Sequence, residues 1–233
     1  AKDYLISPIN TPQLFVEGNY YLTGQQEEIK NKIINGIDNR EHKIWGIQGS
    51  AGTGKTLLLY DIARTLGQMM RVCVIHSGIL SQGHIELNSI LREVDIIPVK
   101  ECNENLIRQY DCILIDESQR LYQVDFDCIV KAFQDLNIHC IFGYDYYQVL
   151  SYAEENRNIP EQLNRLSFFC ENKLSEKIRT NKEVASFIKN VINLAHRPKR
   201  YMDYSNIEVL YAFDYTVAKN IIEHYVTNKE YKF

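Results

Sequence analysis

The octapeptide Gly49-Ser50-Ala51-Gly52-Thr53-Gly54-Lys55-Thr56 matches the pattern G-x-x-x-x-G-K-[ST] without a gap. It stands between an apolar, β-branched run at 43–48 and a helical pattern at 55–66, the strand-to-helix context that this pattern requires. Glycines let such a loop curl until backbone N–H groups and the helix N-terminus face phosphate oxygens. We therefore expect Lys55 to span the β- and γ-phosphates of a nucleotide, and the Thr56 hydroxyl to ligate Mg²⁺.

Further apolar runs alternate with helical patterns along the chain. Expected strands lie at 43–48, 71–76, 112–116, 138–143 and 167–174. Expected helices lie at 25–37, 55–66, 85–94, 127–136 and 181–194, and a last strand and helix at 207–213 and 217–226. The strand patterns are short, β-branched and apolar on both faces, which is typical of strands buried in a parallel sheet. The alternation predicts an α/β fold, a mostly parallel sheet with helices on both faces.

A second chemical motif lies at the end of the expected strand 112–116, where ligands bind in open α/β sheets. We expect Asp116 to hold Mg²⁺ through water, and Glu117 to orient and deprotonate the water that attacks the γ-phosphate. The adjacent carboxylate favours hydrolysis over phosphoryl transfer to a small acceptor. Guanine-binding proteins usually carry Asn-Lys-x-Asp, and the segment 181–184 (NKEV) lacks the Asp. The expected cofactors are therefore ATP and Mg²⁺.

Composition excludes several classes of protein. The chain has 233 residues, 45% of them hydrophobic and 24% charged, as in an ordinary globular domain. No apolar run approaches the ~18 residues of a membrane span and the first residues carry no export signal, so we expect a soluble chain without a membrane partner. The six cysteines contain no C-x-x-C pair, which fits a reducing, cytoplasmic location. Because the net charge is −4, any binding of nucleic acid has to be local.

Four segments together carry a resemblance to a known family. With the loop at 49–56, Asp116-Glu117-Ser118-Gln119 resembles the D-E-x-Q motif of superfamily 1 helicases. Residues 22–26 (LTGQQ) resemble that family's L-x-x-x-Q motif, which reads adenine. Residues 143–148 (GYDYYQ) resemble G-D-x-x-Q with Tyr144 inserted, and 174–180 (LSEKIRT) resemble L-x-x-N-Y-R-[ST] with two changes. The closest pattern is that of the Schlafen-like bacterial DNA/RNA helicase group, whose motifs read like DESQR and LSEKIRTN.

The resemblance implies a RecA-like P-loop ATPase domain and a role for each matched residue. Gln26 would read adenine, with Gln25 as the alternative register. Gln148 would sense the γ-phosphate and link it to a strand-binding surface, and Arg179 would contact the γ-phosphate as an arginine finger. The implied partner is single-stranded DNA or RNA, and Ser77-Gly78 occupies the place where related helicases touch a strand's backbone.

We expect residues 1–200 to form the ATPase domain and 201–233 to form a strand–helix tail, the start of an incomplete second domain. Arg179 is followed by 54 residues, whereas a second motor domain needs on the order of 100 or more. The chain is then either a fragment of a longer protein or a stand-alone ATPase. The sequence also allows a function of another class. In this alternative the chain is an ATP-gated switch that controls a fused or separate partner domain and does not unwind nucleic acid.

Overall fold

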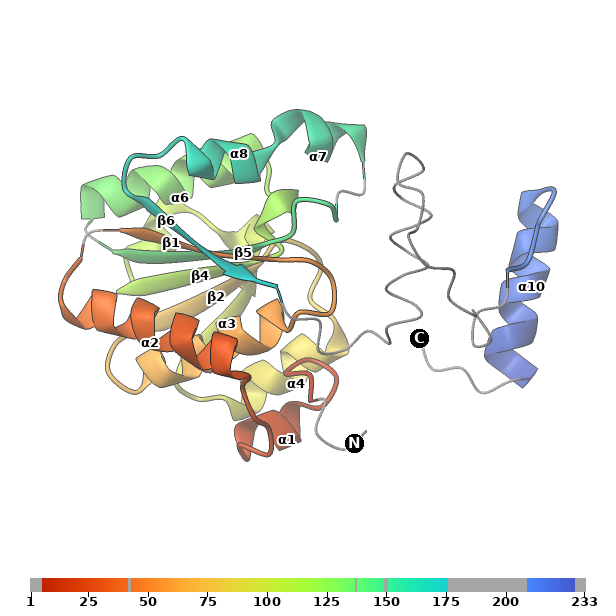
Figure 1. Cartoon of the computed structure of the whole chain (residues 1–233), viewed down its shortest axis with the longest axis horizontal. Helices are drawn as coiled ribbons and strands as arrows, with labels where there is room; N and C mark the ends of the chain where they lie inside the picture. The colour runs from red at the N-terminus through yellow and green to blue at the C-terminus, as the bar shows by residue number, and fades with distance from the viewer. Residues whose placement is uncertain (1–5, 42, 137, 149–150, 176–208, 229–233) are drawn as a thin grey trace. The chain divides into compact units, whose positions relative to one another are not determined.

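Figure 1 shows the computed structural model, which describes residues 6–41, 43–136, 138–148, 151–175 and 209–228. Backbone contacts divide the chain into two compact units, Ala1–Arg179 and Thr180–Phe233, and each is described by itself. Within the described ranges, no helix combines the length and the apolar character that crossing a lipid bilayer requires.

The first unit is built around a sheet whose strands all run parallel. They are β1 Ile44–Gly49, β2 Val72–His76, β3 Val94–Pro98, β4 Cys112–Asp116, β5 His139–Tyr144 and β6 Phe169–Leu174. Their order across the sheet is β3-β2-β4-β5-β1-β6. Every residue of the inner strand β4 is buried, which explains the apolar run that precedes Asp116. The predicted α/β fold with a parallel sheet is confirmed.

Helices cover both faces of this sheet (Figure 1). The longer ones are α2 Gly24–Asp38, α3 Lys55–Gly67, α4 Gln82–Ile90 and α6 Gln123–Leu136. Shorter ones are α1 Pro12–Val16, α5 Glu104–Ile107, α7 Tyr152–Arg157, α8 Ile159–Asn164 and the 3₁₀ turns η2 Val99–Glu101 and η3 Ser118–Arg120. Successive side chains of β4 point to opposite faces of the sheet and so enter different cores. Leu114 packs with α2, α3 and α4, whereas Ile113 and Ile115 pack with α6 and α8.

The predicted end of the helix at 85–94 is wrong, and the strand that follows this helix was not predicted. Helix α4 ends at Ile90, and Val94 begins β3. Strand β3 lies at the edge of the sheet and alternates buried with more exposed residues, so it lacks the unbroken apolar run of an inner strand. Asn88 Oδ1 accepts a hydrogen bond of 2.7 Å from Ile96 N, which ties the helix end to this edge strand.

In the second unit the structure describes residues 209–228. Helix α10 Tyr215–Asn228 confirms the helix expected at 217–226, and Asp214 Oδ1 accepts a hydrogen bond of 2.9 Å from Val217 N in its first turn. The strand expected at 207–213 is absent over 209–213, and residues 207 and 208 lie outside the described ranges. Side chains at 209–213 are exposed, and the strand pairings of the described chain all lie in the first unit, so no ladder partner supports a strand here.

Candidate active site

The loop between β1 and α3 has the backbone that the sequence motif predicts. Gly52 and Gly54 have φ angles of 82° and 80°, in the left-handed region that glycine adopts without strain. Thr53 donates twice to the carbonyl of Ser50, from its backbone N at 3.2 Å and from Oγ1 at 2.9 Å. The loop is therefore closed on itself immediately before Lys55, where α3 begins and where helix N–H groups have no intrahelical acceptor.

Lys55 faces a carboxylate that the sequence analysis did not assign. Its Nζ lies 3.9 Å from Asp145 Oδ2 and donates to Ser50 O at 3.4 Å, and the two charged side chains are 6% and 3% exposed. The inserted Tyr144 is the last residue of β5, and Asp145 follows it directly. The Asp in the segment GYDYYQ was the available signal, but its contact with Lys55 depends on strand order.

Thr56 and Asp116 meet although sixty positions separate them, because Thr56 Oγ1 donates to Asp116 Oδ2 at 3.2 Å. Burial and the neighbouring charge of Glu117 raise the pKa of Asp116 to about 7, against smaller lowering effects of Thr56 and Lys55. A hydroxyl and a carboxylate are oxygen ligands suited to Mg²⁺, and a buried carboxylate of raised pKa gains most from a cation beside it. These two residues fit a magnesium ion.

Glu117 is held in an uncommon backbone conformation. Its φ of 54° lies in the left-handed region, which is sparsely populated by residues other than glycine and often marks functional sites. Its backbone N donates to Asp116 Oδ1 at 3.1 Å, and its side chain accepts a hydrogen bond of 2.7 Å from Gln119 Nε2. The next residue, buried Ser118, donates from Oγ to Gly143 O at 3.0 Å, which anchors the turn to β5. The direction of the Glu117 carboxylate is therefore fixed from both ends.

Gln119 joins the D-E-x-Q segment to the segment after β5. It is 1% exposed, and its Oε1 accepts a hydrogen bond of 3.2 Å from Asp145 N. Its Nε2 donates to Glu117 at 2.7 Å and to the backbone carbonyl of Gln148 at 3.4 Å. The Gln148 side chain itself is exposed.

The two glutamines at the start of α2 face different parts of the site. Gln26 is fully buried, and its Nε2 donates to Thr53 O at 3.4 Å and to Gly54 O at 3.3 Å. Its Oε1 accepts from Thr23 N at 2.9 Å in a capping box. Gln25 instead donates to Lys173 O at 3.0 Å, at the end of β6. Arg179, with the rest of 176–208, lies outside the described residues.

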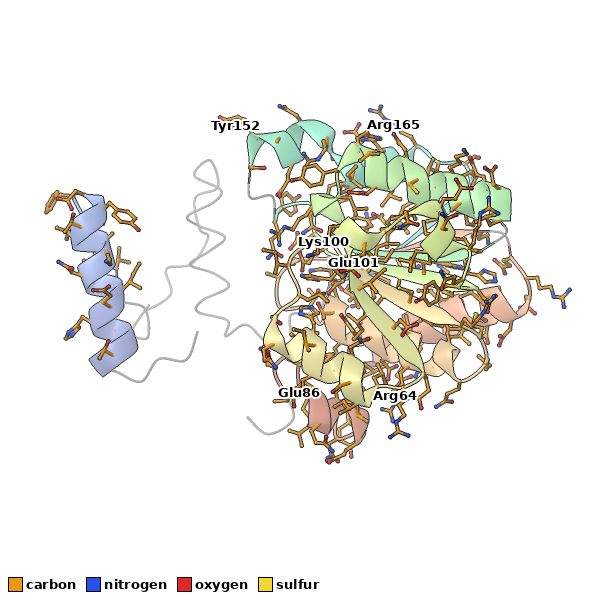
Figure 2. All side chains as sticks on the ribbon, turned by 180° about the vertical axis from the view of Figure 1, so that it is seen from behind. Arg64, Glu86, Lys100, Glu101, Tyr152 and Arg165 are labelled. Carbon is orange, nitrogen blue, oxygen red and sulfur yellow. The ribbon has the colours of Figure 1, made fainter. Side chains whose placement is uncertain are left out.

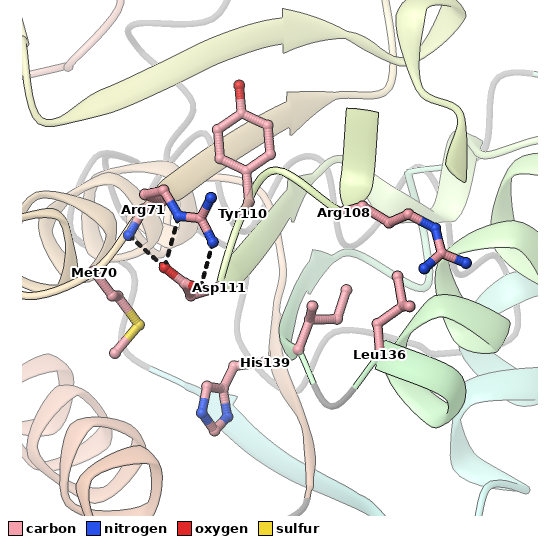
Figure 3. A pocket seen from close by; sticks show the side chains of 8 residues that line it. Met70, Arg71, Arg108, Tyr110, Asp111, Leu136 and His139 are labelled. Carbon is pink, nitrogen blue, oxygen red and sulfur yellow. Dashed lines mark hydrogen bonds and ion pairs between the residues drawn. The ribbon is translucent and has the colours of Figure 1, made fainter. Parts of the chain in front are cut away.

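Pockets occur at both ends of the parallel strands. At the amino-terminal ends of the strands (the amino edge), Arg71, Tyr110, Asp111 and His139 line a cavity of about 350 Å³ (Figure 3). The phosphate loop lies at the opposite ends, because it follows the carboxyl end of β1. At the carboxyl-terminal ends of the strands (the carboxyl edge), a larger pocket of about 650 Å³ follows β2 and β3. Its lining includes Ser77, Gly78, Ile79, Lys100, Arg120 and Tyr122.

The carboxyl-edge pocket adjoins the Asp116 motif. Ser77 N donates to Asp116 O at 3.3 Å, and Arg120 ends the 3₁₀ turn that follows Glu117. Among the described residues, Ser77 Oγ and Arg120 Nε are buried polar atoms without a hydrogen-bond partner. Figure 2 shows Lys100 at this edge, between the helix that carries Glu86 and the helix that carries Tyr152. The pocket therefore offers one polar group without a partner, Ser77 Oγ, beside Arg120, whose Nε forms an ion pair of 3.9 Å with Glu154.

Comparison with solved structures shows the same fold in helicases. The structure of Pif1 helicase from Bacteroides in complex with ADP-AlF3 and ssDNA matches with 16% identity and a TM-score of 0.52, over 91% of this chain and 58% of that one. A structure of two coordinating Pif1 helicases, described for DNA unwinding at forked dsDNA, matches with 17% identity and a TM-score of 0.51, over 74% and 48%. Bacteroides Pif1 bound to ssDNA matches with 17% identity and a TM-score of 0.50, over 75% and 46%.

This chain thus spans about half the length of these helicases. No curated protein matches its sequence. The family model of the Schlafen group 3 DNA/RNA helicase domain, however, matches residues 42–230, well over half of the chain, and confirms the resemblance seen in the motifs. The chain belongs to the Schlafen group 3 DNA/RNA helicase domain family.

Proposed function

We propose that this chain binds Mg·ATP at the loop 49–56 and hydrolyses it, in a reaction coupled to single-stranded nucleic acid. The observation that carries the proposal is the 3.2 Å hydrogen bond between Thr56 Oγ1 and Asp116 Oδ2. It joins the phosphate loop to the acidic motif at one point, beside buried Lys55. Oxygen ligands from both motifs would hold Mg²⁺ there, and the bound ion supplies positive charge to the phosphates.

The residues around this point have complementary roles in hydrolysis. Lys55 would exchange its contact with Asp145 for oxygens of the β- and γ-phosphates, because phosphate carries more charge than one carboxylate. Glu117, held by Gln119 at 2.7 Å, would orient the attacking water and accept its proton. Gln26 is buried beneath the loop and bonded to Thr53 O and Gly54 O, so to read adenine it would exchange one of these bonds for the base. Gln148 would sense the γ-phosphate.

We also propose Arg179 as the group that stabilises charge in the transition state, on the strength of its place in the segment LSEKIRT. An arginine finger contributes ~10³–10⁵ to the rate. Arg179→Ala should therefore lower kcat by at least ~10³-fold and change ATP affinity little, measured by steady-state turnover beside nucleotide titration. A change confined to KM would contradict the role.

The carboxyl-edge pocket is the face we assign to the nucleic acid. Lys100 would meet a backbone phosphate, and Arg120 would exchange its ion pair of 3.9 Å with Glu154 for another. Ser77 Oγ would donate the hydrogen bond that it lacks. Tyr122 is 62% exposed and would offer a ring for base stacking. Because few cations lie here, the affinity should depend weakly on salt. For each phosphate contact on a single strand, log K should fall by ~0.7 per tenfold rise in salt concentration.

The test is the ATPase rate with and without single-stranded DNA or RNA at low salt. Lys100→Ala should weaken strand binding, whereas Glu101→Ala, which removes a neighbouring carboxylate, should not. Gln148→Ala should uncouple the two activities, so that the strand binds without raising turnover. If neither polymer binds or stimulates, the coupling to nucleic acid is refuted and an ATP-gated switch becomes the better reading of the site.

A further inference from the structure

We infer that Gln25 is a positioning residue that clamps the end of β6 beside the phosphate loop, while its neighbour Gln26 holds the loop itself. The inference rests on the proposed ATPase function for its kinetic consequence. Its structural part, the clamp between α2 and β6, stands on contacts alone and has a test of its own.

The Gln25 side chain pairs with the backbone of β6 as another strand would. Its Oε1 accepts a hydrogen bond of 3.0 Å from Ser175 N, and its Nε2 donates to Lys173 O at 3.0 Å. A third contact joins Nε2 to Ser175 Oγ at 3.2 Å. One primary amide thus satisfies a donor and an acceptor at the point where β6 has passed the last pairing with β1, at Leu174. These bonds fix the strand end across 150 positions of sequence.

Gln26 cannot make these contacts, because successive residues of a helix point about 100° apart. Its amide is buried under the phosphate loop and donates to Thr53 O and Gly54 O. Thr23 caps the same helix and accepts from Gln26 N at 3.3 Å. The first turn of α2 therefore contacts the loop with one glutamine and the end of β6 with the other.

The end of β6 lies against the nucleotide site. Leu174 is the register partner of Gly49, the first residue of the loop, and a Cβ at Gly49 would lie 3.1 Å from Leu174 Cβ. Freeing Ser175 from Gln25 would let the end of β6 shift, and Leu174 with it, against Gly49, so the phosphate loop would hold the γ-phosphate less often in the productive geometry.

Substitutions at the neighbouring residues Gln25 and Gln26 separate the clamp on β6 from the support of the loop, measured by steady-state kinetics of the full chain. Gln25→Ala should lower kcat by ~10–100-fold and leave KM for ATP within about twofold, since misplacement of about 1 Å can cost this much. Gln25→Glu keeps the acceptor for Ser175 N but loses the donor to Lys173 O, so it should rescue part of the rate. Gln26→Ala should instead raise KM. Lys32→Met is the matched control, because Lys32 also joins α2 to β6, at Asn172 and 2.8 Å, but farther from the strand end.

Hydrogen–deuterium exchange tests the clamp without any reference to turnover. In Gln25→Ala, exchange of the Ser175 amide should accelerate by ~3–10-fold, as expected for one lost hydrogen bond, while amides inside β6 keep their protection. Unchanged exchange at Ser175 would refute the clamp whether or not the chain hydrolyses ATP. Faster exchange with an unchanged kcat would refute the positioning role, and a changed preference for ATP over GTP would show that Gln25 reads the base instead.

Discussion

At the amino edge of the sheet, Arg71 and Asp111 form an ion pair in water, whereas at the carboxyl edge Lys55 and Asp145 form one in the interior. The first pair is short and has two side-chain bonds, at 3.1 and 2.9 Å, between side chains that are 65% and 45% exposed (Figure 3). The second pair is long, 3.9 Å, between side chains that are 6% and 3% exposed. The exposed pair thus has the better hydrogen-bond geometry, and the buried pair has the poorer one.

The difference indicates which edge is built to bind. The hydrogen bonds of Asp111 hold the Arg71 guanidinium in place, and they hold the pKa of the Asp111 carboxyl below its usual range. Lys55 is buried with a hydrogen bond of 3.4 Å to Ser50 O but with its paired carboxylate 3.9 Å away, and burying a charge is costly unless an anion completes its surroundings. The carboxylates of Asp116, Glu117 and Asp145 gather at the carboxyl edge with the Thr56 hydroxyl and the Lys55 ammonium group, and the direct contacts between these side chains are the Thr56–Asp116 bond of 3.2 Å and the long Lys55–Asp145 pair. If this chain binds a nucleotide as proposed, the ligand should stabilise the site by adding the anion that Lys55 lacks nearby.

In the comparison of the two ends of the sheet, the largest effect should follow from removing one carboxylate charge at the carboxyl edge. Glu117→Gln keeps the side-chain size and can still accept from Gln119, but an amide cannot take a proton from water. We expect kcat for ATP to fall by ~10²–10⁴-fold while nucleotide affinity stays close to that of the unchanged protein. Glu104→Gln, at an exposed carboxylate paired with Arg108, is the control and should keep full turnover. Undiminished hydrolysis in Glu117→Gln would place the base elsewhere.

The buried ion pair can be broken without creating a cavity. Asp145→Asn keeps the volume of the side chain but leaves Lys55 buried beside a neutral group. Removing one partner of a buried pair destabilises by ~3–5 kcal/mol, which corresponds to about 6–20 °C in a domain of this size. Adding ADP should restore more stability to Asp145→Asn than to the unchanged protein, because its phosphates replace the missing anion. Equal melting temperatures without nucleotide would mean that Lys55 does not depend on Asp145.

Local sequence predicts the parts of this site that are contiguous. The loop 49–56 and the pair Asp116-Glu117 each combine a strand pattern with the residues that follow it, so strand, turn and chemistry are read together. Strand β3 was missed because it lies at an edge and alternates, and its start was merged with the preceding helix.

Contacts between distant segments could not be predicted in this way. Asp145 opposes Lys55 only because β5 lies next to β1 in the sheet, and strand order is not a local property of sequence. The same holds for Gln25, which in sequence was only an alternative register for Gln26 and in the structure contacts Ser175. The roles of Gln148 and Arg179 stay predictions, since the Gln148 side chain is exposed and Arg179 lies outside the described residues.

A smaller effect should appear in the pH dependence of stability. Burial raises the pKa of Asp116 from its ordinary 3.8 to about 7, so between these values the folded chain keeps a proton that the unfolded chain has released. The free energy of unfolding should therefore fall as pH rises through this window, by at most ~1.4 kcal/mol per pH unit from this group. Asp116→Asn removes the titration, and the difference between the two denaturation profiles isolates it. Parallel profiles from pH 4 to 7 would show that Asp116 is ionised throughout.

The smallest effect should come from the amino edge, where the ion pair has the better geometry. Asp111→Ala removes the two side-chain bonds to the Arg71 guanidinium and one of 3.0 Å to Arg71 N, but it exposes these donors to water that can replace the carboxylate. The backbone bond from Asp111 N to Arg71 O, at 2.9 Å, remains. We expect the melting temperature to fall by at most about 3 °C and ATP turnover to stay within about twofold. Asp111→Asn, which keeps an acceptor, should lose still less. A tenfold loss of turnover in Asp111→Ala would mean that the amino edge takes part in function, and that the contrast between the two edges is not one of structure against binding.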